Sequence, residues 1–291
     1  MSTENTHDFA MEKRLWRLSP SLHQRFTDAV FALQHILSNY KLLFPDFTDH
    51  SELHSLNVID FCNRLIGDQI SRLNPDELYC LLMGCYFHDT GMGVSRKDFE
   101  EFSAMINFGD YFETHSRDDY PRIIRDYHNE FSALFLKKYA DFFEIPSEAH
   151  LRAILEISRG HRKTNLLDEI QYPVALPVPG GSTVCLPYLA ALIRLADEID
   201  VAAARNSLLL YDIEFLTEVE GNIEFQKHLV VRDLIVTRDA FLMQIETDDP
   251  KLREKIYHLR AKMQQTLDRC REAVLLRTPH VITQERVEII E

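Results

Sequence analysis

The segment LYCLLMGCYFHD, residues 78–89, decides which fold we expect. The residues that recur on one face at helical spacing are apolar: Leu78, Leu81 or Leu82, and Cys85. Asn74 and Pro75 precede this stripe, and a capping residue followed by proline is typical of a helix start. His88 and Asp89 continue the apolar stripe. The segment therefore predicts a buried helix that ends in two adjacent polar groups.

Other ionisable residues also fall on apolar helical stripes: His54, His128, His161 and Asp197. Such a group costs several kcal/mol when buried unless it is paired or coordinated. A single inward histidine is more often a hydrogen-bonded core residue than a ligand. Six such groups from five helices, however, need a common partner, and a metal centre supplies one. The set is large enough for two metals that share an aspartate.

Five segments of the chain resemble the HD-domain metal-dependent phosphohydrolase superfamily: TDHSELHSLNV (48–58), CYFHDTGMG (85–93), YHNEFSALFLKKY (127–139), RGHRK (159–163) and LIRLADEID (192–200). In this resemblance the first histidine of the family falls on His54, the defining pair on His88 and Asp89, and the closing aspartate on Asp197. The resemblance runs from about residue 50 to residue 205. TDHSELHS and RLADEID are also similar to the HD-CE modules of bacterial signalling and conflict systems.

His128 and His161 match the two extra histidines of the binuclear branch of the superfamily. That branch includes HD-GYP-type cyclic-dinucleotide phosphodiesterases and some di-iron oxygenases. Many members continue the pair as HDxGK, whereas Met92 stands at the lysine position here, and the GYP segment is absent. Both differences disfavour cyclic-di-GMP as the substrate. Neither affects the residues that match metal ligands.

The resemblance implies hydrolysis of a phosphoester or phosphoanhydride in a small nucleotide-like substrate by a two-metal-activated water. It implies that His88 and Asp89 are catalytic and that one metal is held by His54, His88, Asp89 and Asp197. The second metal is expected on Asp89, His128 and His161. Imidazole-rich ligation favours Mn or Fe. The alternatives are a di-iron oxygenase with the same ligands and a non-catalytic module that senses a nucleotide.

Five basic residues are expected near the metals, where they could bind substrate phosphate: Arg159, Arg162, Lys163, Arg194 and Arg205. Basic residues at a helix C-terminus also complement the helix dipole, so the first three have an equally good structural explanation. Arg194 could instead pair with Glu198 or Asp200. Asp200 lies one turn after Asp197 and could replace it as ligand, and only the family resemblance favours Asp197. We expect His150, in a polar stretch, to be solvated.

The composition excludes several classes of protein. The net charge is −14, which disfavours polymeric nucleic acid as a partner. Apolar residues make up 45% of the chain, enough for a substantial core, but no apolar run is long enough to span a membrane. The five cysteines form no CxxC pair, and the polar start of the chain does not resemble a secretory signal. We therefore expect a cytoplasmic protein.

The expected fold is mainly α: an HD-domain helical bundle with a small C-terminal β-hairpin and a long C-terminal helix. We place the helical HD domain at 1–210, with its core at about 50–205, and a C-terminal α+β extension packed on it at 211–291. Residues 229–237 and 240–247 alternate like two strands. The helix after Asp249 most simply packs on the same chain, and a homodimer through it is the less favoured alternative. Residues 92–120 and 172–187 interrupt the helical pattern and could cap a site.

Overall fold

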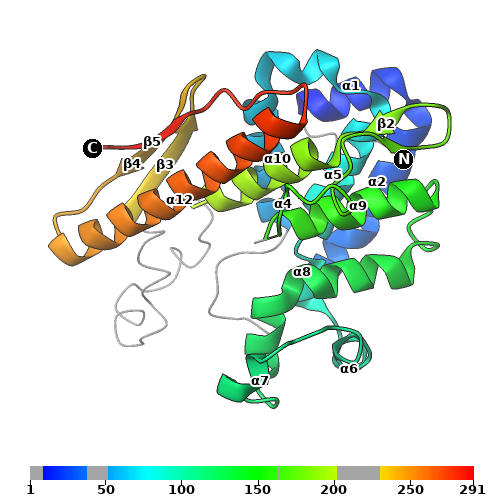
Figure 1. The fold of residues 1–291 in the computed structure, drawn as a ribbon, viewed down its shortest axis with the longest axis horizontal. Coiled ribbons are helices and arrows are strands. Elements are labelled where there is room, and N and C mark those ends of the chain that lie inside the picture. The colour runs from blue at the N-terminus through cyan, green and yellow to red at the C-terminus, as the bar shows by residue number, and fades with distance from the viewer. Residues whose placement is uncertain (1–8, 38–51, 163, 202–229) are drawn as a thin grey trace.

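The computed structural model describes residues 9–37, 52–162, 164–201 and 230–291 (Figure 1). The described part is mainly helical, with a small sheet and a long helix towards the C-terminus, which confirms the predicted fold class. The longer helices of the bundle are α1 (Ala10–Leu18), α2 (Pro20–Leu37), α4 (Glu52–Ile66), α5 (Pro75–Phe87), α8 (Tyr120–Tyr139), α9 (Glu148–Gly160) and α10 (Leu186–Ile199). No described helix is both long and apolar enough to cross a membrane.

Helix α5 is the centre of the bundle. It contacts α1, α2, α4, α8, α9 and α10, and its residues from Glu77 to Phe87 are all buried. A helix that is apolar on all sides is stable only when neighbours cover it all round. Its start is fixed by a capping box, in which Asn74 accepts from the backbone of Glu77 and Glu77 accepts from the backbone of Asn74. The helix therefore begins where the sequence predicts and delivers His88 and Asp89 to the interior.

The N-terminal turn of α5 is also tied to distant segments. The carboxylate of Glu77 accepts from the backbone of Cys185, 3.2 Å away, just before α10. The carboxylate of Asp76 lies 2.9 Å from Nε2 of His150 on α9. His150 is only 3% exposed, so the expectation that it is solvated was wrong. The polar sequence around His150 gives no sign of its burial, because its partner Asp76 is 74 residues away in the chain.

The C-terminal sheet has the strand order β3-β4-β5. Strands β3 (Val231–Val236) and β4 (Ala240–Ile245) form the predicted antiparallel hairpin. A third strand, β5 (Arg286–Ile290), pairs parallel to β4 after the crossover helix α12 (Pro250–Arg277). This strand was not predicted from the sequence. Helix α12 lies alongside α10, and the ammonium of Lys262 binds the carboxylate of Glu198 at 2.9 Å (Figure 1).

The two segments that interrupt the helical pattern have short elements of their own. The first contains the 3₁₀ turn η2 (Thr90–Gly93) and the short helices α6 (Arg96–Ser103) and α7 (Tyr111–Thr114). The second forms a two-stranded hairpin of β1 (Leu176–Pro177) and β2 (Thr183–Val184). A further 3₁₀ turn, η1 (Gly67–Arg72), joins α4 to α5. The domain boundary expected near residue 210 lies outside the described residues.

Candidate metal centre

Five helices bring the expected ligands together in the interior. His54 comes from α4, His88 and Asp89 follow the end of α5, His128 comes from α8, His161 follows α9 and Asp197 lies on α10. The five residues other than Asp197 are at most 6% exposed. The side chain of Asp197 is 26% exposed, so the centre reaches solvent on that side. Residues as far apart in the chain as His54 and Asp197 thus share one small volume.

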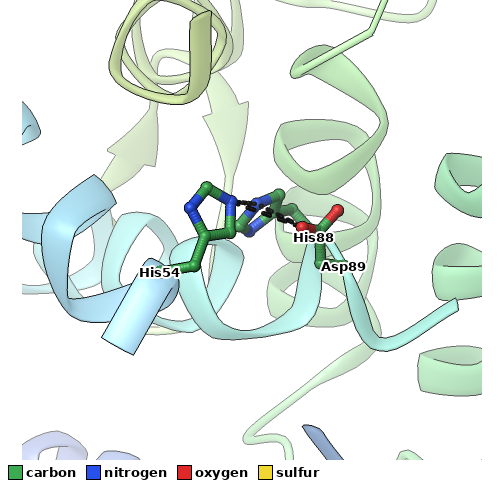
Figure 2. A group of neighbouring side chains, drawn as sticks. All are labelled: His54, His88 and Asp89. Atoms are coloured by element: carbon green, nitrogen blue, oxygen red, sulfur yellow. Dashed lines mark hydrogen bonds and ion pairs between the residues drawn. The ribbon is translucent and has the colours of Figure 1, made fainter. Parts of the chain in front are cut away.

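The first group is formed by His54, His88 and Asp89 (Figure 2). The Nε2 atoms of the two histidines lie 3.0 Å apart. The Oδ2 atom of Asp89 lies 3.3 Å from Nε2 of His54 and 3.4 Å from Nε2 of His88. Asp197 adds its Oδ1 atom at 3.2 Å from Nε2 of His54 and 3.9 Å from that of His88. All these ligand atoms therefore face one point.

The second group is formed by Asp89, His128 and His161. The Nε2 atoms of the two histidines are 2.8 Å apart. The Oδ1 atom of Asp89 lies 3.3 Å from Nε2 of His128 and 4.0 Å from Nε2 of His161. Asp89 therefore turns one carboxylate oxygen to each group. This is the arrangement that a carboxylate bridging two cations requires.

The hydrogen bonds of the outer nitrogens fix the chemistry of the inner ones. Nδ1 of His88 lies 2.8 Å from the carbonyl of Cys85, and Nδ1 of His128 lies 2.7 Å from the carbonyl of Arg125. Nδ1 of His161 likewise contacts the carbonyl of Ser158. A carbonyl only accepts, so each of these Nδ1 atoms carries a proton, and in the neutral imidazole Nε2 carries a lone pair.

The lone pairs of His128 and His161 consequently face each other at 2.8 Å, beside a carboxylate oxygen. Such a group of acceptors is stable only with positive charge among them, either added protons or a metal ion. Burial, followed by the proximity of His128 and His88, lowers the pKa of His161 well below its usual value, so a proton is disfavoured there. The donor set therefore fits a metal cation.

Asp197 and Asp200 occupy different positions around His54. Asp197 turns its Oδ1 atom to Nε2 of His54 at 3.2 Å; burial raises its pKa, but the hydrogen bond with His54 and the positive charge that the surrounding imidazoles carry when no metal is bound outweigh burial and hold that pKa well below its usual range. Asp200 lies behind the ring instead: its Oδ2 atom accepts from Nδ1 of His54 at 2.6 Å. Asn57 also donates to Asp200, at 3.3 Å. A carboxylate behind a ligating histidine fixes the orientation of the ring and its protonated nitrogen.

Substitutions of Asp197 and Asp200 test which of the two aspartates is the metal ligand. Asp197→Asn is expected to lower the metal content of the purified protein, because the amide loses the negative charge that faces His54 and His88. Asp200→Asn is expected to retain metal but to bind it about tenfold more weakly, because an amide oxygen still accepts from Nδ1. Elemental analysis after dialysis and a chelator competition titration measure the two effects. The opposite pattern would show that Asp200 rather than Asp197 is the ligand.

Ser132 joins the two halves of the centre and was not identified from the sequence. Its hydroxyl donates to the carbonyl of His88 at 2.6 Å and accepts from the backbone of Gly91 at 2.8 Å. It lies one turn after His128 on α8, so it holds the turn of His88 and Asp89 against the helix that carries His128.

Tyr127 has φ −122° and ψ 16°, a kink in α8 immediately before His128. Met92, at the position of the family lysine, is buried at 2% exposure.

The five expected phosphate-binding residues are placed differently by the structure. Arg159 donates to Glu130 at 3.2 Å and to Glu156 at 3.1 Å, so two carboxylates share its charge. Arg194 donates to the carbonyl of Gly160 at 2.7 Å and to the backbone and hydroxyl of Thr164, and thereby holds the segment after α9. Arg194 was expected to bind substrate phosphate, with pairing to Glu198 or Asp200 as the alternative; its observed partners are instead Gly160 and Thr164, because the end of α9 lies within reach. Lys163 and Arg205 are outside the described residues.

Of the three expected phosphate-binding residues that the structure describes, Arg162 is the one best placed to meet an anion. It directly follows His161, its side chain is exposed, and its guanidinium makes no hydrogen bond or ion pair within the part of the chain that the structure describes, although its charge acts on the carboxylate of Glu198. A free guanidinium presents several donors to phosphate oxygens in a fixed geometry.

A helical bundle that gathers histidines and aspartates around an adjacent His-Asp pair fits an HD-type metal-dependent enzyme. The sequence profile of the HD-CE family matches residues 44–277. This is more than half of the chain, and the chain therefore belongs to the HD-CE family. Comparison with curated proteins and with solved structures gave no match.

Proposed function

We propose that the protein is a metal-dependent phosphohydrolase, which cleaves a phosphoester or phosphoanhydride of a small nucleotide-like substrate with water. The observation that carries the proposal is the carboxylate of Asp89, which offers one oxygen to each of two histidine pairs. Two divalent ions, most favourably Mn or Fe for such imidazole-rich ligands, would supply Lewis acidity and acidify water. His54, His88, Asp89 and Asp197 would hold one ion, and Asp89, His128 and His161 the other.

The residues of the chain have distinct parts in this reaction. Asp89 would offer one carboxylate oxygen to each ion, and His88 would bind the first ion through Nε2, because its Nδ1 atom donates to the carbonyl of Cys85. The charges also match a phosphate substrate. Asp89, Asp197 and Asp200 bring three negative charges, and two divalent ions bring four positive ones, so the loaded centre is slightly positive within a chain of net charge −14. Arg162 adds a cation that can neutralise charge developing on the phosphoryl group.

The test compares release of phosphate or nucleoside monophosphate by Mn-loaded and Fe-loaded protein, with and without dioxygen, on cyclic and linear nucleotides. Hydrolysis needs the ions only as Lewis acids, so we expect turnover with either metal and no effect of removing oxygen. An activity that requires both iron and oxygen would overturn the proposal in favour of an oxygenase. Loaded protein that binds a nucleotide tightly and never cleaves it would be a sensor instead.

A further inference from the structure

A cavity of about 590 Å³ is lined by residues of α8, of the end of α9 and of the segment between α6 and α7, and none of the six candidate metal ligands is in its wall. Its volume is within the range of small-molecule binding sites. Tyr127 and Asn129, on either side of His128 in the chain, are in its wall, and so is Arg162, which follows His161. The cavity and the second ligand group are thus built on the same two helices. Met105 and Ile106, from the segment before α7, complete the wall opposite.

The Tyr127 side of the cavity is a fixed aromatic surface. The ring of Tyr127 packs edge to face against Phe108 at 4.8 Å and against Tyr111 at 5.1 Å, measured between centroids. Its hydroxyl donates to the carbonyl of Phe108 at 3.3 Å. Tyr111 is itself fixed, because its hydroxyl donates to Asp126 at 2.7 Å. Because these contacts already fix the ring, a planar ligand can stack on it without an additional entropy cost for ordering the side chain.

Two amides in the wall keep hydrogen-bonding capacity. Oδ1 of Asn107 accepts from the backbone of Gly109 at 3.0 Å, which leaves its Nδ2 group without a partner among the described residues. Nδ2 of Asn129 donates to Glu130 at 3.2 Å, and Oδ1 of Asn129 has no hydrogen-bond partner among the described residues. One donor and one acceptor are therefore available, the combination with which amide side chains pair to the edge of a nucleobase.

The charge in the cavity is unevenly distributed. Glu130 and Glu156 compensate Arg159, whereas Arg162 has no such ion pair in the described part of the chain. Arg162 thus lies at the α9 end of the wall, whereas Tyr127 and Asn129 lie on α8 and Asn107 lies between α6 and α7. The remaining carboxylate of the wall, Asp126, accepts from the hydroxyl of Tyr111. A ligand that matches this wall has an anionic group at one end and a planar, hydrogen-bonding group at the other.

We infer that this cavity binds the nucleoside part of a nucleotide, with the base on the Tyr127 side and the phosphate at Arg162, directed to the metal centre. Only one part of this inference rests on the proposed function, namely that the bound nucleotide is a substrate. A sugar phosphate or inorganic phosphate would use Arg162 and leave the aromatic and amide wall without a ligand group.

The experiment measures binding of four nucleoside 5′-monophosphates, ribose 5-phosphate and inorganic phosphate to the metal-loaded protein by calorimetry. At least one nucleotide is expected to bind about tenfold more tightly than ribose 5-phosphate, because stacking of a base adds affinity. Ile106→Trp is expected to remove this advantage by filling the cavity and to leave phosphate binding unchanged. Arg162→Ala is expected to weaken all the phosphorylated probes about tenfold, since it removes charge-assisted hydrogen bonds.

Two further variants control for indirect effects. Met105→Trp also fills the cavity, and its side chain is 63% exposed, so it is the less demanding substitution for the fold. Ile170→Trp is the matched control, because Ile170 is 86% exposed and lies outside the cavity wall. All variants are expected to keep the metal content of the parent protein. If Ile106→Trp loses metal, Met105→Trp replaces it as the variant that fills the cavity.

The outcomes separate this inference from the proposed function. Equal affinity for nucleotides and ribose 5-phosphate, or tryptophan variants that bind nucleotide as the parent does, would overturn the cavity as the nucleoside site even if hydrolysis is observed. Nucleotide binding that the tryptophan variants abolish, without cleavage of any nucleotide, would support the site and overturn the phosphohydrolase. If both hold, the tryptophan variants are expected to raise KM with little change in kcat.

Discussion

The variant Asp89→Ala is expected to bind neither metal ion, whereas the parent protein is expected to bind about two per chain. Asp89 presents Oδ2 to His54 and His88 and Oδ1 to His128 and His161, at 3.3 to 4.0 Å. Alanine therefore removes a ligand from both groups at once. It also leaves two pairs of imidazole lone pairs without the anion that makes the site attractive to divalent cations. Turnover is expected to fall to background for the same reason.

His128→Ala serves as the comparison, because His128 belongs to only one group. We expect it to retain about one ion per chain, held by His54, His88, Asp89 and Asp197. His258→Ala is a suitable control, since the side chain of His258 is 80% exposed on α12. Elemental analysis after reconstitution with Mn or Fe measures all four proteins. Equal metal loss in Asp89→Ala and His128→Ala, or a single ion in the parent, would contradict the bridging position of Asp89.

Gly91→Ala is expected to destabilise the protein by about 3 kcal/mol, because a Cβ atom at this position has no space. It would lie 2.2 Å from the carbonyl oxygen of His128 and 2.7 Å from the backbone nitrogen of Ser132. Both atoms belong to the backbone of α8, so neither can rotate away. The helix would have to move, and His128 would move with it. We therefore expect weakened binding of the second metal in addition to the loss of stability.

Gly84→Ala provides the matched control. Its Cβ would lie 2.6 Å from Cγ2 of Ile157, a side-chain atom that can move, so the loss should be smaller, about 1 kcal/mol. Urea unfolding of the metal-free proteins measures stability, and metal titration measures the displacement of His128. A Gly91 variant as stable as the parent, or less affected than the Gly84 variant, would show that α8 and the turn after Asp89 are not in close contact.

The sequence was informative about local structure because the relevant signals are local. The apolar stripe of α5, its capping residues and the continuation of the stripe through His88 all lie within 16 consecutive residues, 74–89. The same reasoning located His54, His128, His161 and Asp197, since an ionisable group on an apolar stripe has to meet a buried partner. Helix periodicity and two short alternating strands also predicted the fold class.

Pairing across long distances in the chain could not be predicted in this way. Strand β5 pairs parallel to β4 only because α12 returns the chain to the sheet, and five residues with no flanking turn give little signal of their own. Arg194 was expected near the substrate, but a long flexible side chain binds whichever acceptors the fold places within reach. Here these belong to Gly160 and Thr164, more than 29 residues earlier in the chain.

Asp197 and Asp200 illustrate what the sequence determined and what only the tertiary structure determined. Helical periodicity, a property of the sequence alone, determined the helical class and the set of buried ionisable residues, because it decides which side chains leave water. It could not decide which of two aspartates one turn apart faces Nε2 of His54 and which faces Nδ1. The packing of α4 against α10 decided this, with Asp197 at 3.2 Å from Nε2 and Asp200 at 2.6 Å from Nδ1. An imidazole has two chemically different nitrogens, and only its neighbours in space determine which one remains free to bind a metal.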